Sequence, residues 1–224
     1  MRYQGVFFDF DYTLGDSTAA ILKGYQDGFR ALGQPAPTLE QVRPTVGMTL
    51  MDGYALLTGD RDPEHGKEFY HQFQLAVGEL AGAEGTRVME QDSKLLPGAV
   101  ELLTALKLHG ADVAIVSTKL SVTIRQIFAY NHVDHLLDVV IGGKEVRHHK
   151  PDPEGLHLAM SELGLAPEQV LFCGDTVIDA QAARNAGVEF CAVLNGTTPR
   201  EAFDAYPHVH IADDLPELKN WLGV

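Results

Sequence analysis

The stretch Val6–Ser17, "VFFDFDYTLGDS", combines a fold signal with a chemical problem. An apolar run that is typical of a buried β-strand ends at two carboxylates, Asp9 and Asp11, with a single phenylalanine between them. Two neighbouring anions repel one another, so the arrangement is costly unless a cation or a proton lies between them. We therefore expect a ligand to bind at the end of this strand.

The remainder of the chain alternates short apolar runs with amphipathic segments, which is the pattern of an α/β fold. Apolar runs that predict strands lie at residues 5–10, 111–117, 137–142, 169–175 and 188–194, with a weaker one at 209–212. Segments with helical spacing lie between them, at residues 97–110, 121–131, 152–164 and 179–187. Several of the runs are apolar almost throughout, as strands covered on both faces are. We expect a three-layer, Rossmann-like core with a mostly parallel sheet.

The pattern changes after the first strand. Helix-like segments such as 18–33 and 62–82 follow one another with no convincing strand between them. This indicates an all-helical cap domain at residues 17–90, inserted into a catalytic core made of residues 1–16 and 91–224.

Composition limits the possible partners. The chain has 31 acidic and 17 basic residues among 224, which gives a net charge of −14. Such a charge repels nucleic acid and anionic membrane surfaces, so neither is expected as a partner. There is no apolar run of the length that a membrane helix needs and no signal-peptide pattern, so a cytoplasmic location is expected. Both cysteines, Cys173 and Cys191, lie in apolar runs and are interpreted as reduced core residues.

Polar residues follow four of the predicted strands, at the edge where parallel α/β sheets bind ligands. Each residue has an ordinary explanation on its own, since aspartate caps helices and lysine is common in solvated loops. Their occurrence together, each after a strand, is far more specific. The set consists of Asp9, Asp11 and Thr13, then Ser117, Thr118 and Lys119, then Lys150, and finally Gly174, Asp175, Thr176 and Asp179.

This combination suits phosphoryl transfer. Asp9, Asp11 and Asp175 supply the hard oxygen ligands that Mg²⁺ prefers, and the ion would relieve the repulsion between the first two. With Lys150 and a hydrogen bond from Ser117, the site could neutralise a phosphate monoester dianion. One aspartate could then attack phosphorus while another moves a proton. Asp9 and Asp11 can reach the same phosphate only if the strand ends and bends there.

At these residues the chain resembles the haloacid dehalogenase superfamily of phosphohydrolases. That family has Asp-x-Asp-x-Thr after its first strand, Thr or Ser after the second, a Lys in a later loop, and Gly-Asp-x-x-x-Asp at the end of the set. The resemblance runs the length of the chain and includes an insert similar to the family's helical cap. The segments "KPDPEG", "GDTVIDAQAARNAG" and "AVLNG" look like those of the phosphoglycolate phosphatase-like branch.

The resemblance implies a role for each residue. Asp9 would be the nucleophile that forms an aspartyl-phosphate, and Asp11 the general acid and base. Mg²⁺ would be held by the main-chain carbonyl of Asp11 and by the side chains of Asp9 and Asp175, with Asp179 supporting them. The residues expected to bind phosphate are Thr13, Ser117, Thr118 and Lys150.

Three positions depart from the family pattern. Tyr12 stands where members commonly carry Gly, so we expect its turn to use ordinary dihedrals or its ring to have a packing site. Thr118 replaces a common Asn, and Gly15 stands at a usually apolar position near a predicted hinge. In the predicted cap, Arg43 is a candidate for substrate specificity, although a plain surface arginine is an equally good interpretation.

The resulting hypothesis is a Mg²⁺-dependent hydrolase of a small phosphorylated metabolite similar to phosphoglycolate, active as a monomer or homodimer. Two alternatives stay open. A sugar-phosphate mutase of the same superfamily is disfavoured because such enzymes carry an acidic residue where this chain has Gly174. A non-catalytic phosphate-binding or interaction protein on this scaffold is disfavoured because Asp9, Asp11 and Lys150 are all present. A true dehalogenase is disfavoured by Asp11, since a halide leaving group needs no acid.

Overall fold

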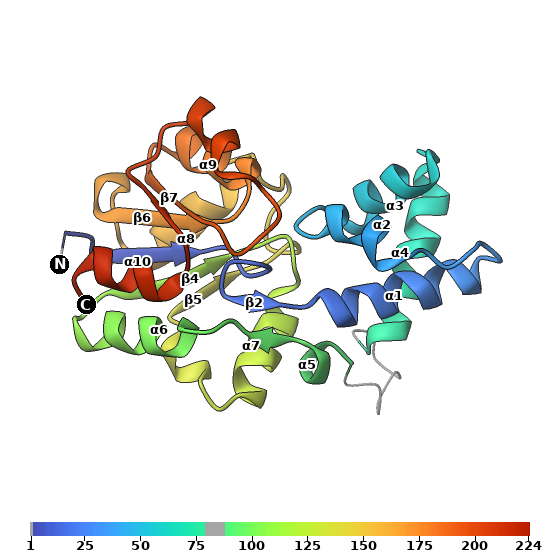
Figure 1. The fold of residues 1–224 in the computed structure, drawn as a ribbon, viewed down its shortest axis with the longest axis horizontal. Coiled ribbons are helices and arrows are strands. Elements are labelled where there is room, and N and C mark those ends of the chain that lie inside the picture. The colour runs from blue at the N-terminus through green and yellow to red at the C-terminus, as the bar shows by residue number, and fades with distance from the viewer. Residues whose placement is uncertain (1, 79–87) are drawn as a thin grey trace. The chain divides into compact units, whose positions relative to one another are not determined.

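The computed structural model describes residues 2–78 and 88–224 and divides the chain into two compact units (Figure 1). One unit consists of Met1–Asp16 with Leu95–Val224, and the other of Ser17–Lys94. We call them the sheet unit and the helical unit. The short strands β2 (Gly15–Asp16) and β3 (Lys94–Leu95) pair in a two-stranded sheet and were not predicted from the sequence.

The sheet unit is built on six parallel strands in the order β5-β4-β1-β6-β7-β8. All six predicted strands form, so the predicted parallel α/β fold is confirmed. Strand β1 lies in the middle, with Phe8 opposite Ile115 of β4 on one side and Cys173 of β6 on the other. The loops that leave these three strands therefore begin side by side. The strands are β1 (Gly5–Phe8), β4 (Asp112–Val116), β5 (Val139–Ile141), β6 (Val170–Gly174), β7 (Glu189–Val193) and β8 (His210–Ala212).

Helices cover both faces of this sheet because successive strand residues point to opposite sides. Val6 and Phe8 pack in one apolar cluster with α6, α7 and α10, and Phe7 packs in another with α8 and α9. Helix α10 was not predicted from the sequence. The helices are α6 (Ala99–Leu108), α7 (Ser121–Tyr130), α8 (Glu154–Leu163), α9 (Val177–Ala186) and α10 (Leu215–Leu222), with 3₁₀ turns η2 (Asp134–Leu136), η3 (Pro167–Gln169) and η4 (Arg200–Ala205).

The helical unit has its own aromatic core. Phe69 is fully buried on α4 and lies 5.0 Å from the ring of Tyr54 and 5.1 Å from that of Tyr25, between ring centroids. Gly24 of α1 faces Phe73, and a Cβ there would lie 2.4 Å from its ring, so the glycine permits the close approach of these helices. The elements are α1 (Thr18–Ala31), α2 (Leu39–Val42), η1 (Arg43–Thr45), α3 (Leu50–Thr58), α4 (Pro63–Val77) and α5 (Val88–Asp92).

Local signals explain where these helices begin and end. The side chain of Asp62 caps α4 by accepting a hydrogen bond from the Glu64 N–H, and Gly78 ends the helix in a left-handed conformation. The predicted helical segment 62–82 is thus observed up to Val77, and residues 79–82 lie outside the described residues.

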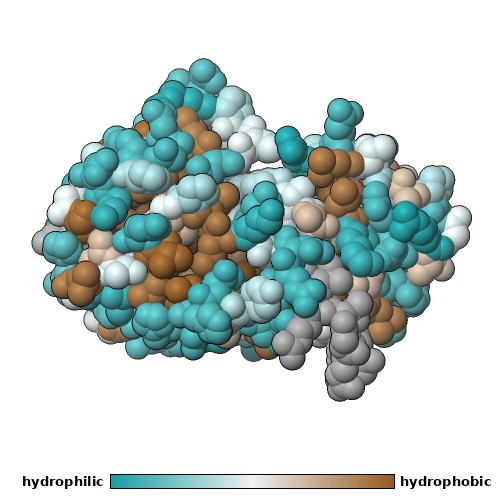
Figure 2. Space-filling model, turned by 60° about the horizontal axis from the view of Figure 1, so that its bottom comes forward, coloured by the Kyte–Doolittle hydropathy of each residue, from teal (hydrophilic) through white to brown (hydrophobic). Residues whose placement is uncertain are grey.

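Hydrophilic side chains dominate the face in Figure 2, and hydrophobic ones are interspersed among them. Within the described ranges, no helix is both long and apolar enough to span a membrane.

Candidate active site

A tight turn follows β1, with Asp9 directly after the strand and Asp11 inside the turn. The strand ends at Phe8, and the Asp9 N–H donates to the Cys173 carbonyl at 2.9 Å. The carbonyl oxygen of Phe10 then accepts hydrogen bonds from three N–H groups, those of Thr13, Leu14 and Gly15, at 3.1, 2.9 and 2.9 Å. The strand therefore does end and bend where the sequence required it.

Tyr12 adopts a backbone conformation that is unfavourable for any residue other than glycine. Its φ is +58°, in the left-handed region, and its N–H donates to the Gly15 carbonyl at 2.6 Å. Of the two alternatives expected for Tyr12, ordinary dihedrals are wrong, because closing this turn requires a positive φ at residue 12, while its side chain is half-buried. A non-glycine residue pays a steric cost there of about 1–2 kcal/mol.

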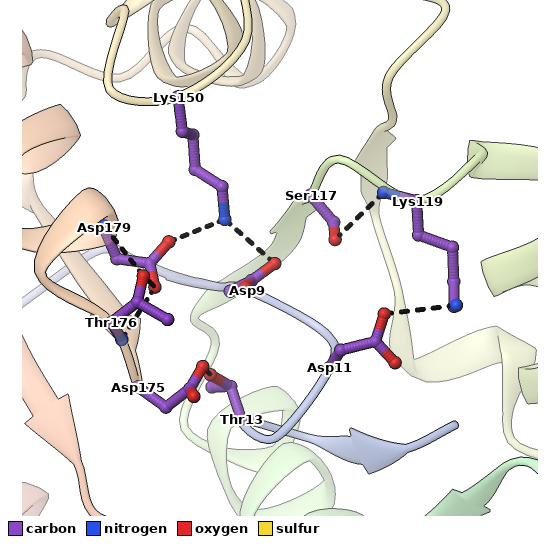
Figure 3. Close-up of polar contacts among 9 residues, drawn as sticks. All are labelled: Asp9, Asp11, Thr13, Ser117, Lys119, Lys150, Asp175, Thr176 and Asp179. Carbon is purple, nitrogen blue, oxygen red and sulfur yellow. Dashed lines mark hydrogen bonds and ion pairs between the residues drawn. The ribbon is translucent and has the colours of Figure 1, made fainter. Parts of the chain in front are cut away.

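Lys150 lies between two buried carboxylates (Figure 3). Its Nζ is 2.6 Å from Oδ1 of Asp179 and 2.9 Å from Oδ1 of Asp9, and 6% of its side chain is exposed. Burial alone would lower the pKa of Lys150, but attraction to Asp179 and Asp9 outweighs it and raises the pKa above its ordinary value. Lys150 is therefore a permanent cation in the described site.

The loop that carries Lys150 is fastened on both sides. The Glu154 carboxylate at the start of α8 accepts hydrogen bonds from the N–H groups of Arg147 and His148, each at 3.0 Å. Asn185 of α9 donates to the Pro151 carbonyl at 2.9 Å. The lysine is thus held by backbone contacts that do not depend on its own charge.

Asp179 has both of its oxygens occupied. Oδ1 accepts from Lys150, while Oδ2 accepts from the backbone N–H and the hydroxyl of Thr176, at 3.1 and 2.6 Å. Burial raises the pKa of Asp179 above its ordinary value. The attraction of Lys150 lowers it again, but by less. Gly174 is needed beside it, since a Cβ at that position would lie 2.5 Å from the Asp179 Cβ.

Asp175 faces the same cluster from the end of β6. Its Oδ1 accepts a hydrogen bond from the buried Thr13 hydroxyl at 3.2 Å. Burial and the nearby negative charges of Asp179 and Asp9 raise the pKa of Asp175 well above its ordinary value. One ligand atom from each of these three aspartates lies within 4.8 Å of the others.

Two contributors to the site were not assigned a role from the sequence. Lys119 forms an ion pair with Asp11, whose Oδ2 lies 3.1 Å from the lysine Nζ, and both side chains are at least nine-tenths buried. Gly196, in the loop after β7, approaches Asp175 so closely that a Cβ there would lie 2.0 Å from Oδ2. The position of Lys119 after a strand was a usable signal, and Gly196 lies in the segment "AVLNG" that carries part of the family resemblance, although no local pattern there indicates its contact with residue 175.

The remaining predicted residues are divided between the two units. Ser117 directly follows β4, its N–H donates to the Ile141 carbonyl at 3.0 Å, and its hydroxyl accepts from the Lys119 N–H at 3.4 Å. Thr118, next to it, is half-buried. Arg43 lies in η1 of the helical unit and is exposed. The structure thus gathers the predicted sheet-unit residues at one edge of the sheet, while their chemical roles stay predictions.

The charge of the cluster suits a divalent cation. The four carboxylates of Asp9, Asp11, Asp175 and Asp179 face the two ammonium groups of Lys119 and Lys150, so the ionised cluster has two more negative than positive charges. Either protonation or a divalent cation would relieve this excess, and carboxylate oxygens are the ligands that Mg²⁺ prefers. The donor set therefore fits the predicted ion.

Comparison with known proteins establishes the family. A family model described as haloacid dehalogenase-like hydrolase matches residues 6–193, and the chain belongs to this family. A crystal structure from Bacteroides fragilis, also described as a haloacid dehalogenase-like hydrolase, has a TM-score of 0.89 and 35% identity. It covers 96% of this chain and 99% of its own. The prediction of an enzyme of this superfamily is thereby confirmed.

Two relatives whose names state an activity are similar to this chain over most of their length. The pyrophosphatase PpaX of Listeria monocytogenes is 31% identical over 183 residues, which are 80% of this chain and 77% of that protein. The phosphoglycolate phosphatase of Yersinia pestis is 28% identical over 219 residues, which are 96% of this chain and 93% of that protein. The resemblance to the phosphoglycolate phosphatase-like branch is thus confirmed.

Proposed function

We propose that this protein is a Mg²⁺-dependent phosphohydrolase that acts on a small phosphate compound through an aspartyl-phosphate. The observation that carries the proposal is the buried cluster in which Lys150 joins Asp9 to Asp179 next to Asp175. A buried cation and a set of excess carboxylates are costly to maintain in a protein that has no anionic ligand and no metal ion to bind.

The chain's own residues can divide the reaction as follows. A carboxylate oxygen of Asp9 attacks phosphorus, and the bond from phosphorus to the leaving-group oxygen breaks while Asp11 gives that oxygen a proton. Water then attacks the phosphorus of the aspartyl-phosphate, Asp11 takes up a proton from this water, and inorganic phosphate leaves with Asp9 restored. Lys150, with the donors Ser117 and Thr118, stabilises the phosphoryl oxygens, and Thr13 would join them if its hydroxyl turned from Asp175 to the phosphate.

Asp9, Asp175 and the main-chain carbonyl of Asp11 would hold Mg²⁺. When bound, the ion would neutralise negative charge on the phosphoryl group. Asp179 would act indirectly, because both of its oxygens are already engaged by Lys150 and Thr176. It would orient the lysine toward the phosphate.

Two features support hydrolysis over the alternatives. A mutase of this superfamily would have an acidic side chain at residue 174, but Asp179 fills the space that any Cβ there would need. A non-catalytic protein on this scaffold would not be expected to keep Asp11 buried, yet its side chain is 6% exposed and paired with Lys119. The names of the relatives suggest phosphoglycolate and pyrophosphate as first compounds to test.

We further propose that residues 17–90 act as the cap and select the substrate, with Arg43 as a candidate contact to the leaving group. The exposed side chain of Arg43 extends from η1, whose neighbours Val42 and Thr45 are buried and fix the turn. A cap that closes and opens would exclude water during transfer and admit it afterwards. Arg43→Ala should change the order in which the protein prefers its substrates. Acetyl phosphate should still be hydrolysed, because its small leaving group offers the cap few contacts.

The test is a panel of small phosphate compounds assayed with Mg²⁺ and with excess chelator. Asp9→Asn should abolish turnover, because it keeps the shape of the side chain and removes the nucleophile. Asp11→Asn should fold, bind Mg²⁺ and lose at least about a hundredfold in kcat/KM on alkyl phosphates. Full activity in chelator would refute the metal requirement, and an active Asp9→Asn would refute the nucleophile.

A further inference from the structure

We propose that Lys119 is a positioning residue, which holds the Asp11 carboxylate so that one of its oxygens faces the leaving group. This inference rests on the proposed function and adds a residue that the functional assignment does not use. Figure 3 shows the Asp11 side chain turned toward Lys119, on the opposite side from Lys150. The site therefore has two buried lysines with different carboxylate partners.

The two carboxylate oxygens of Asp11 have different surroundings. Oδ2 lies 3.1 Å from the Lys119 Nζ, whereas Oδ1 is buried and accepts no hydrogen bond from any described residue. A buried carboxylate oxygen that lacks a partner is destabilising, and more so when it is charged. An oxygen kept in this state is suited to exchange a proton with an incoming group.

Lys119 is itself fixed at both ends. Its backbone N–H donates to the Ser117 hydroxyl at 3.4 Å, and its carbonyl accepts from the Gly143 N–H at 3.0 Å. Gly142 leaves room for that contact, since a Cβ there would lie 2.5 Å from the Lys119 carbonyl oxygen. At the other end, Nζ lies 5.9 Å from the ring centroid of Phe10, which permits a cation–π attraction. The ammonium group therefore has a defined position relative to Asp11.

Lys119 and Lys150 should then have separable effects. Lys150 contacts Asp9 and Asp179, so its loss should affect every phosphate compound alike. Lys119 contacts Asp11, so its loss should matter in proportion to how much the leaving group needs a proton. An alkoxide needs one, whereas a nitrophenolate leaves with little help.

The experiment compares kcat/KM of Lys119→Met for an alkyl phosphate and for para-nitrophenyl phosphate, because kcat/KM includes the leaving-group step and not the later hydrolysis. We expect a loss of at least about tenfold for the alkyl phosphate and below about threefold for the nitrophenyl compound. Lys119→Arg, which can restore the ion pair, should recover most of the loss. Lys144→Met, the same change at an exposed lysine, should alter neither value.

Binding and stability measurements separate the competing roles. Mg²⁺ affinity and vanadate affinity of Lys119→Met should stay within about threefold of wild type, since Lys119 pairs with the Asp11 side chain and contacts neither Asp9 nor Asp179, which lie with Lys150. An equal loss on both substrates would overturn the proposal, and weaker vanadate binding would then assign Lys119 to the phosphate, while a lower Tm would assign it to stability. No loss on either substrate would also overturn it.

The Lys119→Met protein could fail to fold because Asp11 would be left unpaired, so the same change is also tested in the Asp11→Asn variant. In Asp11→Asn, where no anion needs the lysine, adding Lys119→Met should change kcat/KM by less than about twofold. A further loss above about tenfold there would overturn the proposal, because the two residues would act independently. Turnover by the wild-type protein tests the proposed function itself, so a failure of that function is distinguishable from a failure of this inference.

Discussion

Replacing Gly196 with alanine should weaken Mg²⁺ binding without unfolding the protein. The new Cβ would lie 2.0 Å from Oδ2 of Asp175, whereas an ordinary contact needs about 3.4 Å, so one of the two groups must move by about 1.4 Å. The loop of Gly196 is anchored, because the Leu194 N–H donates to the Ala212 carbonyl at 2.9 Å and Asn195 donates to the Thr13 carbonyl at 3.5 Å. We therefore expect the Asp175 carboxylate to move.

The expected loss follows from the contacts of Asp175. A shift of this size removes its hydrogen bond from Thr13 and misdirects an oxygen that would bind the ion. Changes to residues that orient metal ligands commonly cost 10–100-fold in affinity, which is about 1.4–2.8 kcal/mol. Isothermal titration calorimetry of the folded protein with Mg²⁺ measures this directly, without reference to any substrate.

Gly66→Ala is the matched control for this prediction. The atom nearest to a Cβ at Gly66 would be the flexible end of Met51, 3.2 Å away, so alanine should be tolerated in the interior of α4. This variant should bind Mg²⁺ as wild type does and gain up to about 1 kcal/mol of stability from helix propensity. If Gly196→Ala bound Mg²⁺ within about threefold of wild type while remaining folded, the loop would have moved instead, and the argument from Asp175 would be refuted.

Three further predictions concern charge and backbone strain. Lys150→Ala should lower kcat/KM by about 10²–10³ on all substrates, because it removes a buried cation from the phosphate site, and a loss below about threefold would place the lysine outside that site. In chelator, Asp175 binds more protons in the folded than in the unfolded state between pH 3.8, its ordinary pKa, and its raised folded value, so its contribution should make Tm fall as pH rises through this window, relative to Asp175→Asn. Mg²⁺ should flatten that dependence, and a Tm that instead rose across the window in chelator would contradict the raised pKa. At Tyr12, where φ is +58°, glycine should be more stable than alanine by about 1 kcal/mol in thermal unfolding, and the reverse order would show that the turn is not strained.

Much of the site could be predicted because its residues follow the strands in sequence. Asp9, Ser117 and Asp175 each come directly after an apolar run, and parallel strands bring their carboxyl ends to one edge. Local periodicity therefore placed them together before any tertiary contact was known. Spacing acts in a similar way in the helical unit, where Phe69 and Phe73 are four residues apart on α4 and both are buried in its core.

Other features depend on contacts between distant residues that no local pattern encodes. The close approach of Gly196 to Asp175 joins loops that leave two different strands, and a glycine in a loop has many ordinary explanations. The pairing of Lys119 with Asp11 depends on where the chain turns after β4, because the neighbouring Gly142 and Gly143 fix that turn by their own close contacts.

The sequence by itself determined the order of the strands' polar ends, the helical insert and the family resemblance, because these follow from periodicity and short spacings along the chain. Only the tertiary structure decided which lysine pairs with which carboxylate, since Lys119 and Lys150 both lie in loops that follow strands and no local pattern assigns a partner to either. It also decided the conformation of Tyr12. Steric preference argued against a positive φ there, but the three hydrogen bonds that converge on the Phe10 carbonyl close the turn and hold residue 12 in it.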